Sequence, residues 1–230
     1  MPEVKVFSYS ERGIFNSIIF YLREHPEKTS GFISTLDIND TFFNDDEVSY
    51  TFLNEQSFSD FDYNDWIIIA KKGNEKRVIF IEGKVKTFNG KYDIEEEFDK
   101  IRKDKKYDGV SSNIFAQLYY KYLLKELGSQ SQISSVVGKK EVKKIGENEI
   151  VKKAYNDYVL DASSSSFYYV AILPVELCND EFIKKFNALE PNMESKNIKC
   201  AYWGSIECFF GKAGATEVIE NFDYNRGQIY

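Results

Sequence analysis

The short run 82–84 (EGK), at the end of an apolar stretch, constrains this sequence more than any other feature. The preceding residues 78–81 (VIFI) are typical of a strand that is buried on both faces. Glu82 and Lys84 are two residues apart, so in a continued strand both side chains lie on the same face. An unpaired charge beside a core strand is costly, and we therefore expect a charged partner or a metal ion there.

A second acidic residue is predicted to lie opposite Glu82. The apolar run 65–70 begins with Asp65, and the polar segment that follows it contains Gly-Asn at 73–74, a natural hairpin turn. A hairpin centred on that turn pairs positions whose numbers sum to 147, as those of Asp65 and Glu82 do. Their Cβ atoms would then lie roughly 5 Å apart on one face, which favours a divalent cation between the carboxylates. The alternative is a slipped hairpin in which both acids are solvated.

The residues around this hairpin resemble the motif of the PD-(D/E)XK nuclease superfamily. The family pattern is an acid at the start of one strand and acid-X-Lys at the end of the next, and segments 64–66 (NDW) and 81–84 (IEGK) are similar to it. Asn64 stands where the family usually has proline. The resemblance implies a restriction-endonuclease-like α/β fold with α-β-β-β-α-β order and a mixed central sheet flanked by helices.

The resemblance also implies roles for the motif residues. Asp65 and Glu82, with the backbone carbonyl of Gly83, would bind Mg²⁺, for which Mn²⁺ could substitute. Lys84 would orient the attacking water and stabilise charge that develops on the phosphate. The implied reaction is hydrolysis of a phosphodiester bond in DNA that leaves a 5′-phosphate. Restriction, phage defence and DNA repair are processes that use such an activity.

Two predicted helices carry further candidates. Residues 8–11 (SYSE) have capping-box spacing, and apolar residues at helical period follow them. Glu11 is either an auxiliary ligand to metal or water, as the resemblance implies, or the capping-box partner of Ser8. Gln117, on the predicted helix 113–127, is either an accessory site residue, again by resemblance, or a surface glutamine.

The rest of the sequence predicts an alternation of strands and helices. Strands are expected at 47–58 and 167–173 and once or twice within 198–210, and helices at 94–106 and 180–189. We expect a single nuclease-like domain over residues 1–230, interrupted by a lysine-rich insertion at about 128–160. Four lysines of this insertion are either candidates for binding DNA phosphates or part of a solvated surface: Lys139, Lys140, Lys143 and Lys144.

Composition argues against several other classes of protein. His25 is the only histidine among 230 residues, so histidine-based catalysis and histidine-rich zinc sites are poorly supported. The three cysteines are odd in number and widely spaced, which indicates free thiols in a reducing cytoplasm rather than disulfides. No run approaches the roughly 18 apolar residues of a membrane span, so we expect no membrane partner.

Three functions remain open. The first is a Mg²⁺-dependent deoxyribonuclease with DNA as its partner, and a homodimer would suit the cutting of both strands. The second is a catalytically vestigial nuclease-fold protein that serves as a nucleic-acid-binding or assembly subunit, which the net charge of −7 slightly favours. The third is an unrelated α/β interaction protein whose hairpin acids are accidental. Mn²⁺ binding separates the first function from the third.

Overall fold

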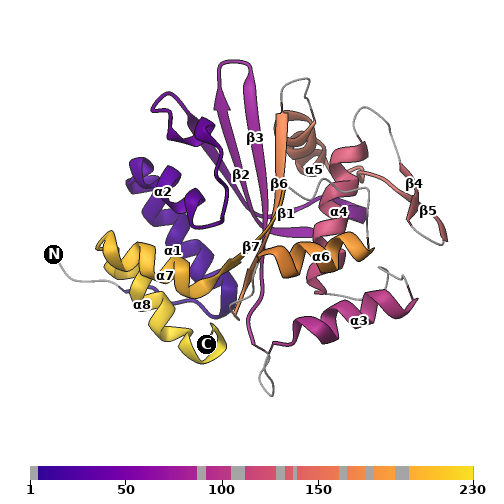
Figure 1. Cartoon of the computed structure of the whole chain (residues 1–230). Coiled ribbons are helices and arrows are strands. Elements are labelled where there is room, and N and C mark those ends of the chain that lie inside the picture. Colours follow the sequence, from indigo (N-terminus) through magenta and orange to yellow (C-terminus); the bar gives the residue numbers. More distant parts are fainter. Residues whose placement is uncertain are drawn as a thin grey trace.

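A five-stranded mixed sheet forms the centre of the molecule (Figure 1). The computed structural model describes residues 5–86, 92–104, 112–127, 133–136, 139–160, 165–174, 179–189 and 197–229. The sheet has the strand order β1-β2-β3-β6-β7. Its strands are β1 (Ser49–Ser57), β2 (Tyr63–Lys72), β3 (Glu75–Gly83), β6 (Ser165–Leu173) and β7 (Ile198–Tyr202). A separate two-stranded sheet, within the predicted insertion, pairs β4 (Ile133–Val136) with β5 (Lys139–Lys143).

Helices cover both faces of the sheet (Figure 1). One group consists of α1 (Ser10–Glu24), α2 (Thr29–Ser34), α7 (Trp203–Lys212) and α8 (Thr216–Tyr224). The other consists of α3 (Ile94–Asp104), α4 (Ile114–Leu127), α5 (Glu149–Ala154) and α6 (Asn179–Leu189). A short helix α9 (Arg226–Ile229) ends the described chain. Within the part of the chain that the structure describes, no helix is both long and apolar enough to span a membrane.

Strand direction explains the helices on one face of the sheet, that of α3, α4 and α6. The pairs β1–β2 and β2–β3 are antiparallel, whereas β3–β6 and β6–β7 are parallel. Parallel neighbours need a crossover, and α3 and α4 lie between β3 and β6 in the chain, while α6 lies between β6 and β7. The prediction of an α/β protein with a mixed sheet flanked by helices is confirmed at this level.

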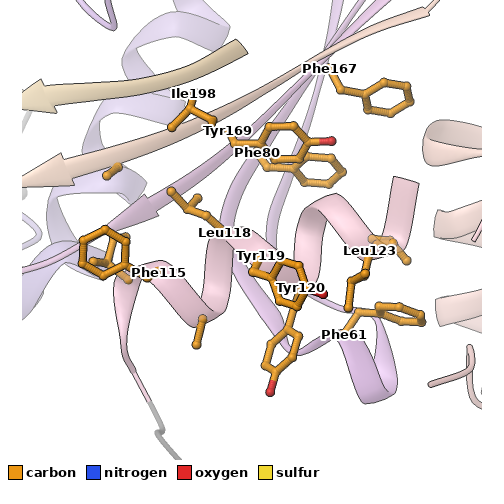
Figure 2. Close-up of a cluster of buried hydrophobic side chains, with 14 of the residues drawn as sticks. Phe61, Phe80, Phe115, Leu118, Tyr119, Tyr120, Leu123, Phe167, Tyr169 and Ile198 are labelled. Carbon is orange, nitrogen blue, oxygen red and sulfur yellow. The ribbon is translucent and has the colours of Figure 1, made fainter. Parts of the chain in front are cut away.

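The central strands are buried on both faces, as their continuous apolar runs predict. In β2, Trp66 and Ile68 face the core beneath α1, α2, α7 and α8, whereas Ile67 and Ile69 face the opposite core. Figure 2 shows the second core, in which α4 packs against β3 and β6. The rings of Phe80 and Tyr169 stack there with centroids 5.8 Å apart. This packing fixes α4 against the end of β3.

The order of elements differs from the predicted α-β-β-β-α-β order. An additional helix, α2, precedes β1, and three helices lie between β3 and β6. Three more helices follow β7. Of the one or two strands expected within 198–210, β7 forms the first, but residues 203–210 belong to α7 instead of a second strand. Residues Trp203, Ile206 and Phe210 are buried at helical spacing, so their apolar side chains form the inner face of α7.

The predicted capping box at residues 8–11 is not formed. Helix α1 begins at Ser10, and its N-cap residue Tyr9 makes no side-chain capping hydrogen bond. The backbone N–H of Ser8 donates instead to Oδ1 of Asn221, at 3.4 Å. Contacts between the N-terminal segment and α8 therefore replace the local capping interaction.

Candidate metal centre

The β2–β3 hairpin has the register that the sequence predicts. Trp66 pairs with Ile81 and Lys72 with Glu75, and each pair of numbers sums to 147. The turn lies at Gly73 and Asn74, and Gly73 has a positive φ of 55°, which glycine adopts without strain. Continuing this register by one residue past Trp66 and Ile81 places Asp65 opposite Glu82.

A direct hydrogen bond connects the two acid-bearing strand ends. Oδ2 of Asp65 accepts from the backbone N–H of Gly83, at 2.8 Å. Gly83 is also required by packing, because a Cβ atom there would lie 2.8 Å from Cε2 of Phe15 and 3.1 Å from Cζ2 of Trp203. The glycine thus allows α1 and α7 to approach β3 closely.

Glu82 is a fully buried carboxylate. Its side chain has no exposed surface, and both of its oxygens lack a hydrogen-bond partner among the described residues. Burial raises the pKa of Glu82 well above its usual value, and the neighbouring charge of Asp65 raises it further. Lys121 and Lys84 act in the opposite direction. Such a group is unusual in a folded protein and marks a candidate functional site.

Lys121 on α4 is a site residue that the sequence analysis missed. Its ammonium is fully buried and lies 3.9 Å from Oε1 of Glu82. The same ammonium donates to the backbone carbonyls of Phe61, at 2.7 Å, and Tyr63, at 2.6 Å. Burial lowers the pKa of Lys121, and the charge of Glu82 opposes that effect. A signal was present, because the lysine lies three residues after Leu118, within the apolar stripe of its helix.

Glu11 extends from α1 toward the same acids. Together with Asp65 it lines a pocket of about 250 Å³. Burial raises the pKa of Glu11; the charge of Asp65 adds to this rise, whereas that of Lys84 opposes it. Its carboxylate accepts from the hydroxyl of Ser10. Glu11 therefore lies beside Asp65, and its role as an auxiliary ligand to metal or water stays a prediction.

Glu55 is a second residue that the sequence analysis missed. The pairs Asn54–Trp66 and Gln56–Asn64 leave Glu55 opposite Asp65 across β1 and β2, yet its φ is +52°. A positive φ in a non-glycine residue is strained and occurs more often at functional sites than elsewhere. Glu55 also lines the pocket and forms an ion pair with Arg12.

The remaining candidates are Gln117 and the four lysines of the insertion. Gln117 is partly buried, and its Oε1 atom has no hydrogen-bond partner among the described residues. The side chain of Lys143 is 8% exposed, donates to the carbonyl of Asp60 at 3.0 Å and lies 4.3 Å from the ring centroid of Tyr120. This favours an internal role for Lys143. Lys144 is exposed, and the side chains of Lys139 and Lys140 lie outside the described residues.

The donor set suits magnesium better than zinc. In the described part of the chain, no group of three or more His, Cys, Asp or Glu side chains is arranged to hold a metal. Asp65, Glu82 and the carbonyl of Gly83 offer hard oxygen donors, and Mg²⁺ commonly binds one or two carboxylates while it keeps several waters. The orphaned oxygens of Glu82 fit such an ion.

Comparisons with known proteins leave the site to be interpreted from its own geometry. No protein-family model, curated protein or solved structure matches the chain. The function is therefore inferred from the buried Glu82 and the partly buried Asp65, from Lys84 and Lys121, and from the strained Glu55.

Proposed function

We propose that this chain is a Mg²⁺-dependent deoxyribonuclease with a restriction-endonuclease-like core. The observation that carries the proposal is that both carboxylate oxygens of Glu82 lack hydrogen-bond partners among the described residues, next to Asp65 at the end of a hairpin with the expected register. An anion in that position is stabilised when a cation binds it. The antiparallel strands β1 to β3, followed by helices and the parallel strand β6, form the kind of mixed sheet that the resemblance implies.

Each residue at the site has a distinct role in this proposal. Asp65, Glu82 and the carbonyl of Gly83 would hold Mg²⁺, which supplies an activated water and stabilises negative charge on the phosphate. Lys84 donates a hydrogen bond that orients the water or stabilises the charge on phosphorus. Water attacks phosphorus and the bond to the 3′-oxygen breaks, which gives a 5′-phosphate and a 3′-hydroxyl. Glu11 borders this site and would orient bound water.

The cellular setting of the proposal is the cytoplasm, where DNA would be the partner. Cys208 is a free, exposed thiol, which is compatible with a reducing compartment. The phosphate contacts would come from the lysine-rich insertion, where the exposed Lys144 remains a candidate.

The second candidate is a nuclease-fold subunit without catalytic activity. The complete burial of Glu82 favours it, because a catalytic carboxylate must reach its metal. The net charge of −7 points the same way, since it disfavours nonspecific binding of a polyanion.

A cleavage and binding experiment decides between these functions. Plasmid, linear duplex and single-stranded DNA are incubated with the full chain and Mg²⁺, Mn²⁺ or a chelator, beside a Glu82→Gln variant as the matched control. A nuclease cleaves only with metal, and Glu82→Gln abolishes the cleavage. Mn²⁺ binding without cleavage of any substrate favours the subunit. Absence of Mn²⁺ binding contradicts the metal site altogether.

A further inference from the structure

The turn that leads into β2 is built around the ammonium of Lys121. Asp62 and Ser59 have positive φ values of 68° and 59°, which are strained for residues other than glycine. The carbonyls of Phe61 and Tyr63, on either side of Asp62, both accept from Nζ of Lys121. Figure 2 shows Phe61 near Leu123 on α4, so this turn packs against the helix that carries the lysine. Contacts from outside the turn therefore hold its strained backbone.

The same ammonium faces the second acid of the site. It carries three N–H groups, two of which donate to the carbonyls of the turn. Oε1 of Glu82 lies 3.9 Å from the same nitrogen. This separation is too long for a direct hydrogen bond but gives strong attraction between two groups without exposed surface. Asp65 lies only two residues after Tyr63 in β2. One buried lysine therefore contacts the backbone that carries Asp65 and favours the ionised form of Glu82.

We propose that Lys121 is the positioning residue of the Asp65–Glu82 site. It fixes the turn from which β2 presents Asp65, and it keeps the carboxylate of Glu82 in place within the core. Both acids are then held ready for a divalent cation before that cation arrives. This inference rests on the proposed metal site.

A merely structural role for the lysine is the alternative, and Lys143 provides a matched comparison. Lys143 is also nearly buried and also donates to a carbonyl of this turn, that of Asp60, at 3.0 Å. Lys121, in addition, faces Glu82, with its nitrogen 3.9 Å from Oε1. Loss of Lys143 should affect only the start of the turn, at Asp60, whereas loss of Lys121 should release the carbonyls of Phe61 and Tyr63 next to β2 and remove the cation that faces Glu82.

The test compares Mn²⁺ binding by the full chain and by Lys121→Met and Lys143→Met, measured by calorimetry, after circular dichroism has established that each is folded. Lys121→Met should weaken Mn²⁺ binding by roughly 10- to 100-fold, as loss of groups that support metal ligands commonly does. Lys143→Met should leave the affinity within about twofold of the original. In cleavage assays, Lys121→Met should raise the Mg²⁺ concentration for half-maximal rate while turnover at saturating Mg²⁺ recovers.

Each other outcome overturns the inference in a recognisable way. If Lys121→Met binds Mn²⁺ as tightly as the unchanged chain, or if both variants lose affinity equally, Lys121 has no specific positioning role, although the metal site stands. If the unchanged chain binds no Mn²⁺, the proposed function fails and the inference fails with it.

A measurement on the unchanged chain covers the case in which Lys121→Met does not fold. Titration with Mg²⁺, followed by ¹⁵N NMR, should shift the backbone signals of Phe61, Tyr63 and Lys121 at the same concentrations that shift the signal of Glu82. Saturation with Mg²⁺ that leaves these three signals unmoved would exclude the coupling between the turn and the site.

Discussion

Oδ2 of Asp65 accepts a 2.8 Å hydrogen bond from the backbone N–H of Gly83, so the first acid of the site is bound to the residue that follows the second. This bond holds two strand ends together although Asp65 and Glu82 repel each other when both are charged. The carboxylate of Asp65 thus stabilises the hairpin through its hydrogen bond to Gly83 and destabilises it through repulsion of Glu82. Substitutions of Asp65 can separate these two effects.

We expect Asp65→Asn to be more stable than Asp65→Ala by about 1–2 kcal/mol, because an amide oxygen can still accept from Gly83 whereas alanine leaves a buried N–H without a partner. Both variants should lose Mn²⁺ binding, since both lack the carboxylate. Urea unfolding in the presence of a chelator measures the difference in stability. Equal stability of the two variants would show that the hydrogen bond contributes nothing.

The stability of the metal-free chain should fall as the pH rises above about 4.5, the usual pKa of glutamate. Burial, with the charge of Asp65, raises the folded-state pKa of Glu82, and burial also raises that of Glu11. Between the usual and the raised pKa, the unfolded chain has released protons that the folded chain retains, so ionisation favours unfolding. One group contributes at most about 1.4 kcal/mol per pH unit.

Chemical unfolding at a series of pH values, with a chelator, measures this dependence. Glu82→Gln should reduce the slope of stability against pH, and an unchanged slope would mean that the dependence arises from another group.

Asp40 has the opposite effect, because its ionisation stabilises the folded chain. Burial opposes ionisation of Asp40, but its hydrogen bonds, led by that from Arg77, outweigh burial and lower its pKa from 3.8. The stability that Asp40 contributes is therefore lost only as the pH falls below that value.

The part of the site that the sequence predicts is the part that local rules determine. The Gly73–Asn74 turn and the two apolar runs specify the hairpin register, and the register alone brings Asp65 opposite Glu82. No contact from elsewhere in the chain is needed for that inference.

The remainder depends on interactions between distant segments. Lys121 meets Glu82 only because α4 crosses the sheet, and Lys143 is buried because its segment packs on the turn at Asp60. The left-handed conformation of Glu55 leaves no pattern in the residue types around it. By contrast, the spacing of Trp203, Ile206 and Phe210 in the sequence fits a helix, but their apolar and aromatic side chains favoured the prediction of a strand.

The ion pair at the hairpin end of β3 should contribute to stability without affecting the metal centre. Nε of Arg77 donates to Oδ2 of Asp40 at 2.8 Å, and the guanidinium lies 4.3 Å from the ring centroid of Phe42. The two charged side chains are only 14% and 20% exposed, so removal of the arginine leaves a poorly solvated carboxylate. We expect Arg77→Met to lower the free energy of unfolding by about 2–4 kcal/mol.

The control for this prediction is Arg12→Met, which breaks an ion pair between side chains that are 66% and 40% exposed. That change should lower the free energy of unfolding by no more than about 1 kcal/mol. Urea unfolding measures both variants. A similar loss from the two substitutions would mean that burial does not determine the strength of these pairs.

Lys84→Met should separate turnover from metal binding. The main chain at Lys84 is fixed independently of its side chain, because its N–H donates to the carbonyl of Ile172 and its carbonyl accepts from Nε1 of Trp203, each at 2.8 Å. The variant should therefore fold and bind Mn²⁺ with nearly unchanged affinity. Its turnover at saturating Mg²⁺ should fall by roughly 10²-fold or more, since the ammonium acts on charge that develops during the reaction.

Lys86→Met is the matched control for that variant. Lys86 is also partly buried, and its N–H donates to the carbonyl of Gln228 at 2.7 Å, so its main chain is fixed in the same way. Because it lies two residues beyond Lys84, outside the acid-X-Lys motif, its loss should reduce turnover by no more than about threefold. Single-turnover cleavage with both variants distinguishes chemistry from product release. Full activity in Lys84→Met would remove this lysine from the mechanism while leaving the metal ligands untouched.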